Sequence, residues 1–210
     1  LLRFEREVVA MVADHLHAPA GTVGSFTSGG TESILCAVKA ARDFTLAKRK
    51  GAVSGASQPL EMVLPTTAHA AFHKAASYFG LRKVLVPVDP LTFAAVPAAM
   101  EAAITPQTAL IVGSTPSYAH GVIDPVTALG EIALRHDVLF HVDACVGGFL
   151  LPFWRKSGAN VPVCDLSVPG VTSLSVDLHK YAFCPKGASL VFHTRAEIQR
   201  AQYFACSSWS

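Results

Sequence analysis

The feature that most limits the fold of this chain is a repeated alternation between short apolar segments and amphipathic segments of helical length. Apolar residues recur at helical spacing in residues 4–16, 31–48, 69–79 and 126–135, and Phe93, Val96, Met100 and Ile104 mark a further helix. The strand-like segments are residues 62–64, 83–88, 109–112, 138–142, 173–176 and 188–192, and the last is expected to run back. This pattern predicts an α/β fold with a mainly parallel central sheet and helices on both faces.

Composition excludes several classes of protein. The chain has 210 residues, of which 51% are hydrophobic and 15% charged, and its formal net charge is +2. It is too apolar for an intrinsically disordered protein and lacks the basic excess of a nucleic-acid-binding protein. No apolar stretch reaches the ~20 residues of a membrane span. Five cysteines without a CxxC pair indicate reduced thiols and a cytoplasmic location.

Polar and glycine-rich residues follow the predicted strands, at residues 114–120, 143–148 and 177–180. In open α/β sheets, ligands bind at the carboxyl ends of the strands. We therefore expect the functional site at that edge. Residues 51–59, rich in glycine, serine and alanine, predict a surface loop or lid.

A glycine pair precedes the strongest predicted helix, in the segment TSGGTES (27–33). Glycines let the backbone approach a ligand closely, and the free N–H groups of a helix start favour an anion such as a phosphate. The same residues are equally typical of an ordinary helix cap. The sequence leaves both interpretations open.

Two charged residues follow predicted buried strands. Asp143 can pair with a protonated pyridine nitrogen, although a loop-capping role is the commoner use of such a residue. Lys180 follows the strand that ends at Asp177. A lysine in an apolar setting loses its proton readily and forms Schiff bases, and the alternative is a surface lysine.

His69 stands at the start of a predicted helix, where its ring can stack on a planar ligand or hydrogen-bond to the helix end. His69 and His73 form an HxxxH pattern, but no third ligand stands nearby in the sequence, so no metal site is predicted. An anion cradle, a stacking imidazole, a strand-end carboxylate and a strand-end amine are together what pyridoxal 5′-phosphate requires.

Five segments carry a resemblance to a known family: TSGGTES, TTAHAAFHKAASYFG, STPSYAHGVIDP, HVDACVGGF and SVDLHKYAFCPKGAS. They resemble the sphingosine-1-phosphate lyases, fold-type I pyridoxal-phosphate enzymes of the group II decarboxylase type. The resemblance implies that Lys180 forms the Schiff base with the cofactor, that Asp143 pairs with its pyridine nitrogen and that His69 stacks on its ring. It also implies that Lys186 contacts the substrate or its phosphate.

The same resemblance assigns the remaining cofactor contacts. It implies that the cofactor phosphate is held by Gly30, Thr31 and His179. Thr115 and Cys145 would line the cofactor pocket, with His120 as a further pocket candidate.

The activity implied by the resemblance is retro-aldol cleavage of a phosphorylated sphingoid base to a long-chain aldehyde and phosphoethanolamine, in a homodimer. A pyridoxal-phosphate amino-acid decarboxylase of the same fold remains an alternative, because the glycine pair, Asp143 and Lys180 serve the cofactor rather than the substrate. A further alternative is that the chain is a catalytically incomplete fragment that acts as an assembly partner.

The resemblance makes residues 1–210 the cofactor-binding large domain, without the N-terminal segment and the small C-terminal domain of the family. The low content of charged residues fits a domain whose apolar faces are covered by those parts and by a second subunit. Any membrane anchor is expected to lie outside this chain.

Overall fold

A single mixed sheet organises the computed structural model, which describes residues 1–50, 58–206 and 208. In this part of the chain the sheet has seven strands in the order β1-β7-β6-β5-β4-β2-β3. The strands are β1 (Val23–Thr27), β2 (Glu61–Pro65), β3 (Arg82–Val86), β4 (Thr108–Ser114), β5 (Leu139–Asp143), β6 (Ser173–Asp177) and β7 (Ser189–His193). The helices are α1 (Leu2–His15), α2 (Gly30–Lys50), α3 (Ala70–Phe79), α4 (Pro97–Ala102), α5 (Val126–His136), α6 (Gly147–Lys156) and α7 (Ala196–Arg200).

The directions of the strands determine where the loops meet. Strands β2 to β6 run parallel to one another, whereas β7 runs antiparallel to both β6 and β1. The predicted parallel sheet and the reversed last strand are therefore confirmed. Because β1 and β6 both oppose β7, they point the same way, and the carboxyl ends of β1, β2, β4, β5 and β6 lie at one edge of the sheet.

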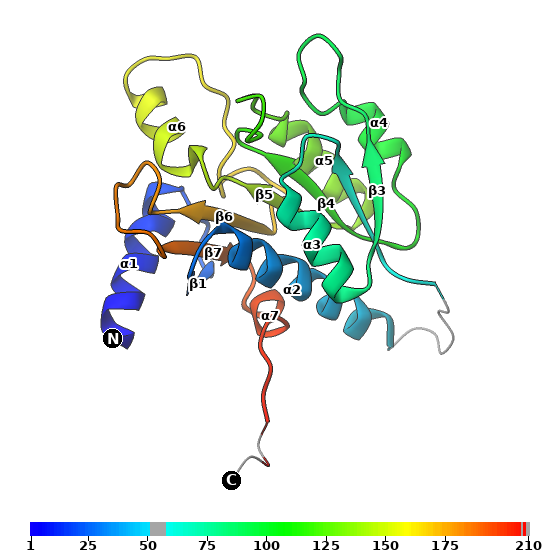
Figure 1. Ribbon diagram of the computed structural model, residues 1–210, viewed down its shortest axis with the longest axis horizontal. Coiled ribbons are helices and arrows are strands. Elements are labelled where there is room, and N and C mark those ends of the chain that lie inside the picture. Colours follow the sequence, from blue (N-terminus) through cyan, green and yellow to red (C-terminus); the bar gives the residue numbers. More distant parts are fainter. Residues whose placement is uncertain (51–57, 207, 209–210) are drawn as a thin grey trace.

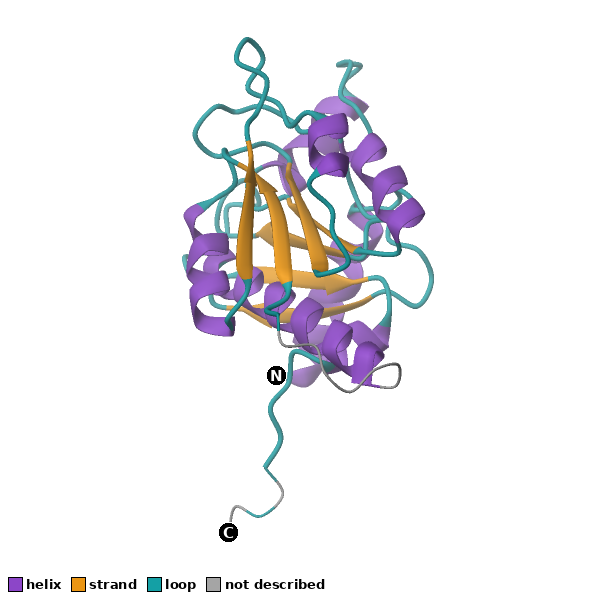
Figure 2. Cartoon of the chain, turned by 90° about the vertical axis from the view of Figure 1, so that its right-hand side faces the viewer, coloured by secondary structure: helices purple, strands orange, loops and turns teal. Residues whose placement is uncertain are grey.

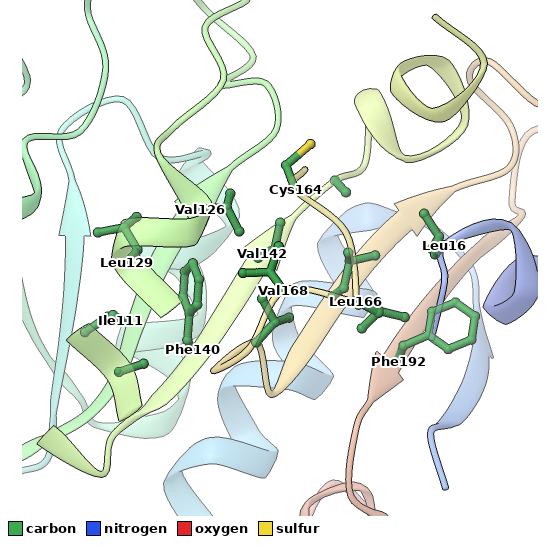
Figure 3. Close-up of a cluster of buried hydrophobic side chains, with 14 of the residues drawn as sticks. Leu16, Ile111, Val126, Leu129, Phe140, Val142, Cys164, Leu166, Val168 and Phe192 are labelled. Carbon is green, nitrogen blue, oxygen red and sulfur yellow. The ribbon is translucent and has the colours of Figure 1, made fainter. Parts of the chain in front are cut away.

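Helices cover both faces of the sheet, as predicted (Figures 1 and 2). Helices α2, α3 and α7 pack on one face, where Phe72 of α3 is fully buried. Helices α1, α4, α5 and α6 pack on the other. Figure 3 shows part of this second cluster, with Phe140 of β5 beside Leu129 of α5. Burial on both faces explains the apolar run 109–112 inside β4.

Three elements were missed in the sequence. Strand β1 contains Gly24 and is only partly buried, so it lacks the apolar pattern of the inner strands. Helix α6 begins at a glycine pair and contains Pro152, both of which are unfavourable in helices. Helix α7 has five residues, too few for a periodic pattern to show.

The predicted helix from Phe93 to Ile104 is wrong at its start. Phe93 has a φ of +60°, in the left-handed region, and lies in a turn. Asp89 stabilises this turn, because its Oδ1 accepts hydrogen bonds from the backbone N–H groups of Leu91 and Thr92 at 2.9 and 2.8 Å. Helix α4 begins only at Pro97, a residue that favours the first helical position.

No helix among residues 1–50, 58–206 and 208 is both long enough and apolar enough to span a membrane. The predicted loop or lid at residues 51–59 lies mostly outside the described residues, which omit 51–57.

Gly130 provides a test of the packing of α5 against the loop before β6. Replacement of a helical glycine by alanine ordinarily stabilises a helix by about 1 kcal/mol. Here a Cβ would overlap the carbonyl oxygen of Pro169, so we expect Gly130→Ala to lower the free energy of unfolding by about 1–3 kcal/mol. Urea unfolding of the variant and the parent measures the sign. A stabilised variant would contradict this close contact.

Candidate active site

A cavity of about 390 Å³ opens at the carboxyl edge of the sheet. It is lined by residues that follow β1, β2, β4, β5 and β6 and by the first turns of α2. This volume lies within the roughly 300–1,000 Å³ range of small-molecule sites. Seven of the nine predicted site residues line it, namely Gly30, Thr31, His69, Asp143, Cys145, His179 and Lys180.

Lys180 forms an ion pair with Asp177 inside this cavity. Its Nζ lies 2.9 Å from Asp177 Oδ2, and the Asp177 side chain is almost fully buried. Ser189 of β7 donates a second hydrogen bond, at 2.6 Å, to Asp177 Oδ1. Burial lowers the pKa of Lys180, but the hydrogen bond and the charge of Asp177 outweigh it and leave the pKa raised. The amine is therefore held as an ammonium group.

Asp143 ends β5 as predicted and is 8% exposed. Its Oδ1 accepts hydrogen bonds from the Cys145 backbone N–H at 3.1 Å and from Ser175 Oγ at 3.3 Å. Burial, followed by the charges of Asp143 and Asp177, raises the pKa of the Cys145 thiol well above its usual value. Cys145 is consequently a neutral thiol that forms part of the cavity wall.

The glycine pair stands where the chain enters α2. Just before it, the backbone N–H and the hydroxyl of Ser28 both donate to Glu32 Oε2 at 2.6 Å, and these bonds lower the pKa of Glu32. Gly30, the first residue of α2, lines the cavity. A Cβ on Gly30 would lie 2.8 Å from Cys145 Sγ and 3.0 Å from the Asp177 carboxylate oxygens. Only glycine leaves this space open.

Two histidines line the cavity. His69 caps α3, with its Nδ1 accepting from the Ala71 N–H at 3.1 Å, and its ring lies edge-on to Tyr118 at 6.1 Å between centroids. His179 Nδ1 accepts from the Ala188 N–H at 3.3 Å, and its Nε2 lies 3.6 Å from Asp177 Oδ2. His73 contacts Lys83 instead, and no metal-binding cluster of three ligands occurs in residues 1–50, 58–206 and 208.

Two predicted site residues, and the further candidate His120, lie outside the cavity lining. Thr115 is buried behind Pro116, in the wall of a separate small cavity, and its Oγ1 has no hydrogen-bond partner among the described residues. Lys186 is exposed in the loop between β6 and β7. His120 is exposed and stacks on Phe93, with 4.6 Å between ring centroids. Their roles in a site stay predictions.

Asp177 is the site residue whose role the sequence analysis missed. The sequence places it in the candidate segment 177–180 without a role of its own, although it ends its strand as Asp143 does and stands three residues before Lys180. That spacing, together with burial of the strand, was the signal for an ion pair. Glu32 and Tyr118 also line the cavity, and neither belongs to a pattern that distinguishes it from a surface residue.

The fold and the cavity define a class of enzyme. A mainly parallel sheet whose carboxyl edge holds a paired lysine, a strand-end carboxylate and a glycine-lined helix start is the arrangement of the fold-type I pyridoxal-phosphate enzymes. The sequence pattern of the "Pyridoxal-dependent decarboxylase conserved domain" matches residues 1–206. The chain therefore belongs to the pyridoxal-dependent decarboxylase family.

Among curated proteins, sphingosine-1-phosphate lyases are similar to nearly all of this chain. A sphingosine-1-phosphate lyase of Arabidopsis thaliana is 47% identical over 100% of this chain and 38% of that protein. The Dictyostelium discoideum sphingosine-1-phosphate lyase is 44% identical over 99% of this chain and 38% of that protein. The chain thus spans about two-fifths of the length of these relatives.

Solved structures agree on the fold. A sphingosine-1-phosphate lyase from Burkholderia pseudomallei matches 99% of this chain and 48% of its own, with a TM-score of 0.93 and 38% identity. A glutamate decarboxylase from Lactobacillus brevis matches 94% of this chain and 46% of its own, with a TM-score of 0.85. At 21% identity, the second match concerns the fold alone.

The cofactor of the family, pyridoxal 5′-phosphate, fits the residues present. It needs an amine, an acceptor for its ring nitrogen and a cradle for its phosphate. Lys180 and Asp143 line the same cavity, and the space beside Gly30 is one that a Cβ would fill.

The space beside Gly30 yields a matched pair of variants. We expect Gly30→Ala to weaken binding of pyridoxal phosphate at least about tenfold, because the added methyl group would approach Cys145 and Asp177 too closely. Gly29→Ala is the control, since its Cβ would meet only His179 Cε1, at an ordinary 3.7 Å. Cofactor titration followed by absorbance measures both. Equal affinities in the two variants would contradict the close-packed cradle.

The ion pair predicts a pH effect on Lys180. Because Asp177 raises the pKa of Lys180, Asp177→Asn should lower it and give more free amine at a given pH. We expect the pH profile of reductive methylation of Lys180 in cofactor-free protein, followed by peptide mass spectrometry, to move to lower pH. The exposed Lys186 in the same samples is the internal control. An unmoved Lys180 profile would count against the ion pair.

Proposed function

We propose that this chain is the cofactor-binding part of a pyridoxal-phosphate-dependent carbon–carbon lyase. Its substrate would be a phosphorylated sphingoid base, cleaved to a long-chain aldehyde and phosphoethanolamine. The observation that carries the proposal is the 44–47% identity to sphingosine-1-phosphate lyases across nearly all of this chain. The glutamate decarboxylase structure of the same fold is 21% identical.

When bound, pyridoxal phosphate supplies an aldehyde that combines with amines and a protonated ring that accepts the electron pair of a breaking carbon–carbon bond. Lys180 would anchor the cofactor, and Asp143 would keep the ring nitrogen protonated. His69 would stack on the ring. Gly30, Thr31 and His179 would hold the phosphate, which the free N–H groups at the start of α2 favour.

Lys180 also takes part in a proposed proton transfer. Its Nζ lies 2.9 Å from Asp177 Oδ2, so a proton acceptor stands beside the amine in the buried wall of the cavity. We propose that Asp177 takes this proton when Lys180 must act as a nucleophile and returns it afterwards. A buried carboxylate suits this task because few other groups compete for the proton.

Three further residues complete the proposed site. Lys186 is proposed to contact the substrate phosphate, since it is an exposed cation on the loop that follows Lys180. Cys145, which follows β5 and lines the cavity, and Thr115, which follows β4 behind that lining, are proposed to bound the cofactor pocket.

Assembly and location are proposed on separate grounds. We propose a homodimer, supported by large apolar side chains left exposed at Leu2 and Phe4 of α1, Phe153 and Trp154 of α6, and Phe183. A cytoplasmic location is supported by the buried cysteines Cys145 and Cys164, neither of which is in a disulfide.

Amino-acid decarboxylation is the second candidate. It is favoured by the family pattern itself, which describes a decarboxylase domain. The two reactions use the same cofactor residues, so the cavity geometry supports both.

A product assay separates the two reactions. With a phosphorylated sphingoid base, the purified protein should release a long-chain aldehyde and phosphoethanolamine without carbon dioxide. Lys180→Ala should abolish turnover and the trapping of cofactor by borohydride, because it removes the only amine that lines the cavity among the described residues. Carbon dioxide released from amino acids, without aldehyde from the phosphorylated base, would favour the decarboxylase instead.

A further inference from the structure

A histidine of β5 connects to Asp143 through Ser175 of the neighbouring strand, and it contacts Ser173 of that strand on its other side. In the register of β5 and β6, His141 pairs with Ser173 and Asp143 pairs with Ser175. Alternate residues of a strand point to the same face, so these side chains lie together, on the face that α2 and α3 cover. His141 Nδ1 lies 2.8 Å from Ser173 Oγ, and Nε2 lies 3.2 Å from Ser175 Oγ.

His141 is uncharged in this position. It is fully buried, with the ring of Phe72 edge-on at 5.8 Å, and burial lowers its pKa to about 3, helped by the neighbouring His193. A neutral imidazole has one N–H group and one acceptor nitrogen. One ring nitrogen therefore donates to its serine, and the other accepts.

The hydrogen bond between Ser175 and Asp143 determines which ring nitrogen of His141 donates. Ser175 Oγ lies 3.3 Å from Asp143 Oδ1, and a carboxylate only accepts, so the single hydroxyl proton of Ser175 points to Asp143. Ser175 Oγ must then accept from His141 Nε2–H. His141 Nδ1 in turn accepts from the Ser173 hydroxyl. If Ser175 donated to His141 Nε2 instead, no proton would lie between Ser175 Oγ and Asp143 Oδ1, and two acceptor oxygens would face each other.

The hydroxyl group of Ser175 then makes three hydrogen bonds, one as a donor and two as an acceptor. It donates to Asp143 and accepts from His141 and from the Cys145 thiol, whose Sγ lies 3.4 Å away. The hydrogen bonds to the Asp143 carboxylate from Ser175 and from the Cys145 backbone both end on Oδ1. Oδ2 is left for a ligand in the cavity that Asp143 lines.

We propose that His141 is a positioning residue, which acts through Ser175 to hold Asp143 as an oriented anion for the cofactor's ring nitrogen. The chain of hydrogen bonds runs in one direction, from Ser173 through His141 and Ser175 to Asp143. Donation to a carboxylate favours its charged form, and the charged form keeps the ring nitrogen protonated. The inference rests on the role proposed for Asp143 above.

His193 provides a matched control. It is as buried as His141 and faces the same Ser173 in the strand register, from β7. Its Nε2 lies 3.3 Å from Gln202 Oε1, and no hydrogen bond joins it to Ser175 or Asp143 within the described residues. A change at His193 disturbs the packing of the sheet without breaking the chain of hydrogen bonds.

The experiment measures the ring nitrogen itself. The purified protein is loaded with pyridoxal phosphate labelled with ¹⁵N in the ring, and the chemical shift and the cofactor dissociation constant are recorded without substrate. We expect Ser175→Ala and His141→Phe to move the shift toward the unprotonated value and to weaken binding about tenfold. Ser173→Ala should move it less, in the same direction, and His193→Phe should leave it at the parent value.

The possible outcomes test the chain of hydrogen bonds separately from the proposed function. If His141→Phe does not fold, the two serine variants, each of which removes one hydroxyl, carry the test. Folded Ser173→Ala and Ser175→Ala proteins with the parent's shift would overturn the chain of hydrogen bonds alone. The same shift change in His193→Phe would overturn it too, since packing would then be the cause. A parent that binds no cofactor would overturn the proposed function as well.

Discussion

The carboxylate of Asp177, buried at the end of β6, is the group on which the rest of the site depends. A buried charge is costly unless it is paired and hydrogen-bonded. Ser189 and Lys180 meet this requirement, and in doing so they fix the cavity ends of β6 and β7 and the position of the amine. The same carboxylate oxygens would lie only 3.0 Å from a Cβ on Gly30, which favours glycine at the start of α2.

The directions of the strands bring the residues of the site to one edge of the sheet. Two antiparallel steps through β7 return β1 to the direction of β6, which brings the start of α2 to the same edge as Asp143 and Asp177. Residues about 150 positions apart in the chain thereby share one cavity. Each strand contributes only one or two residues at its end, while the apolar remainder holds the sheet between two layers of helices.

Much of this was predictable from sequence, for a physical reason. Inner strands are buried on both faces and long helices on one, so β5 and α3 carry patterns that periodicity detects, and the polar residues that follow them indicate the site. Periodicity fails where other forces act. Pro152 lies inside α6, and Asp89 stabilises a turn where the spacing of Phe93 predicts helix. The ion pair of Lys180 with Asp177 needed the fold, because only burial distinguishes it from a surface pair.

The two strand-end aspartates show how neighbouring strands give one residue type two tasks. Asp177 faces a cation, and its negative charge raises the pKa of Lys180 and keeps the amine protonated. Asp143 accepts hydrogen bonds from neutral donors, Ser175 and the Cys145 backbone, and no cation is hydrogen-bonded to it among the described residues. It therefore stays available for a cationic ring nitrogen. If both carboxylates had cationic partners, the cavity could hold an amine but could not keep a pyridine ring protonated. The difference arises from Ser175, which occupies the position opposite Asp143 in the sheet.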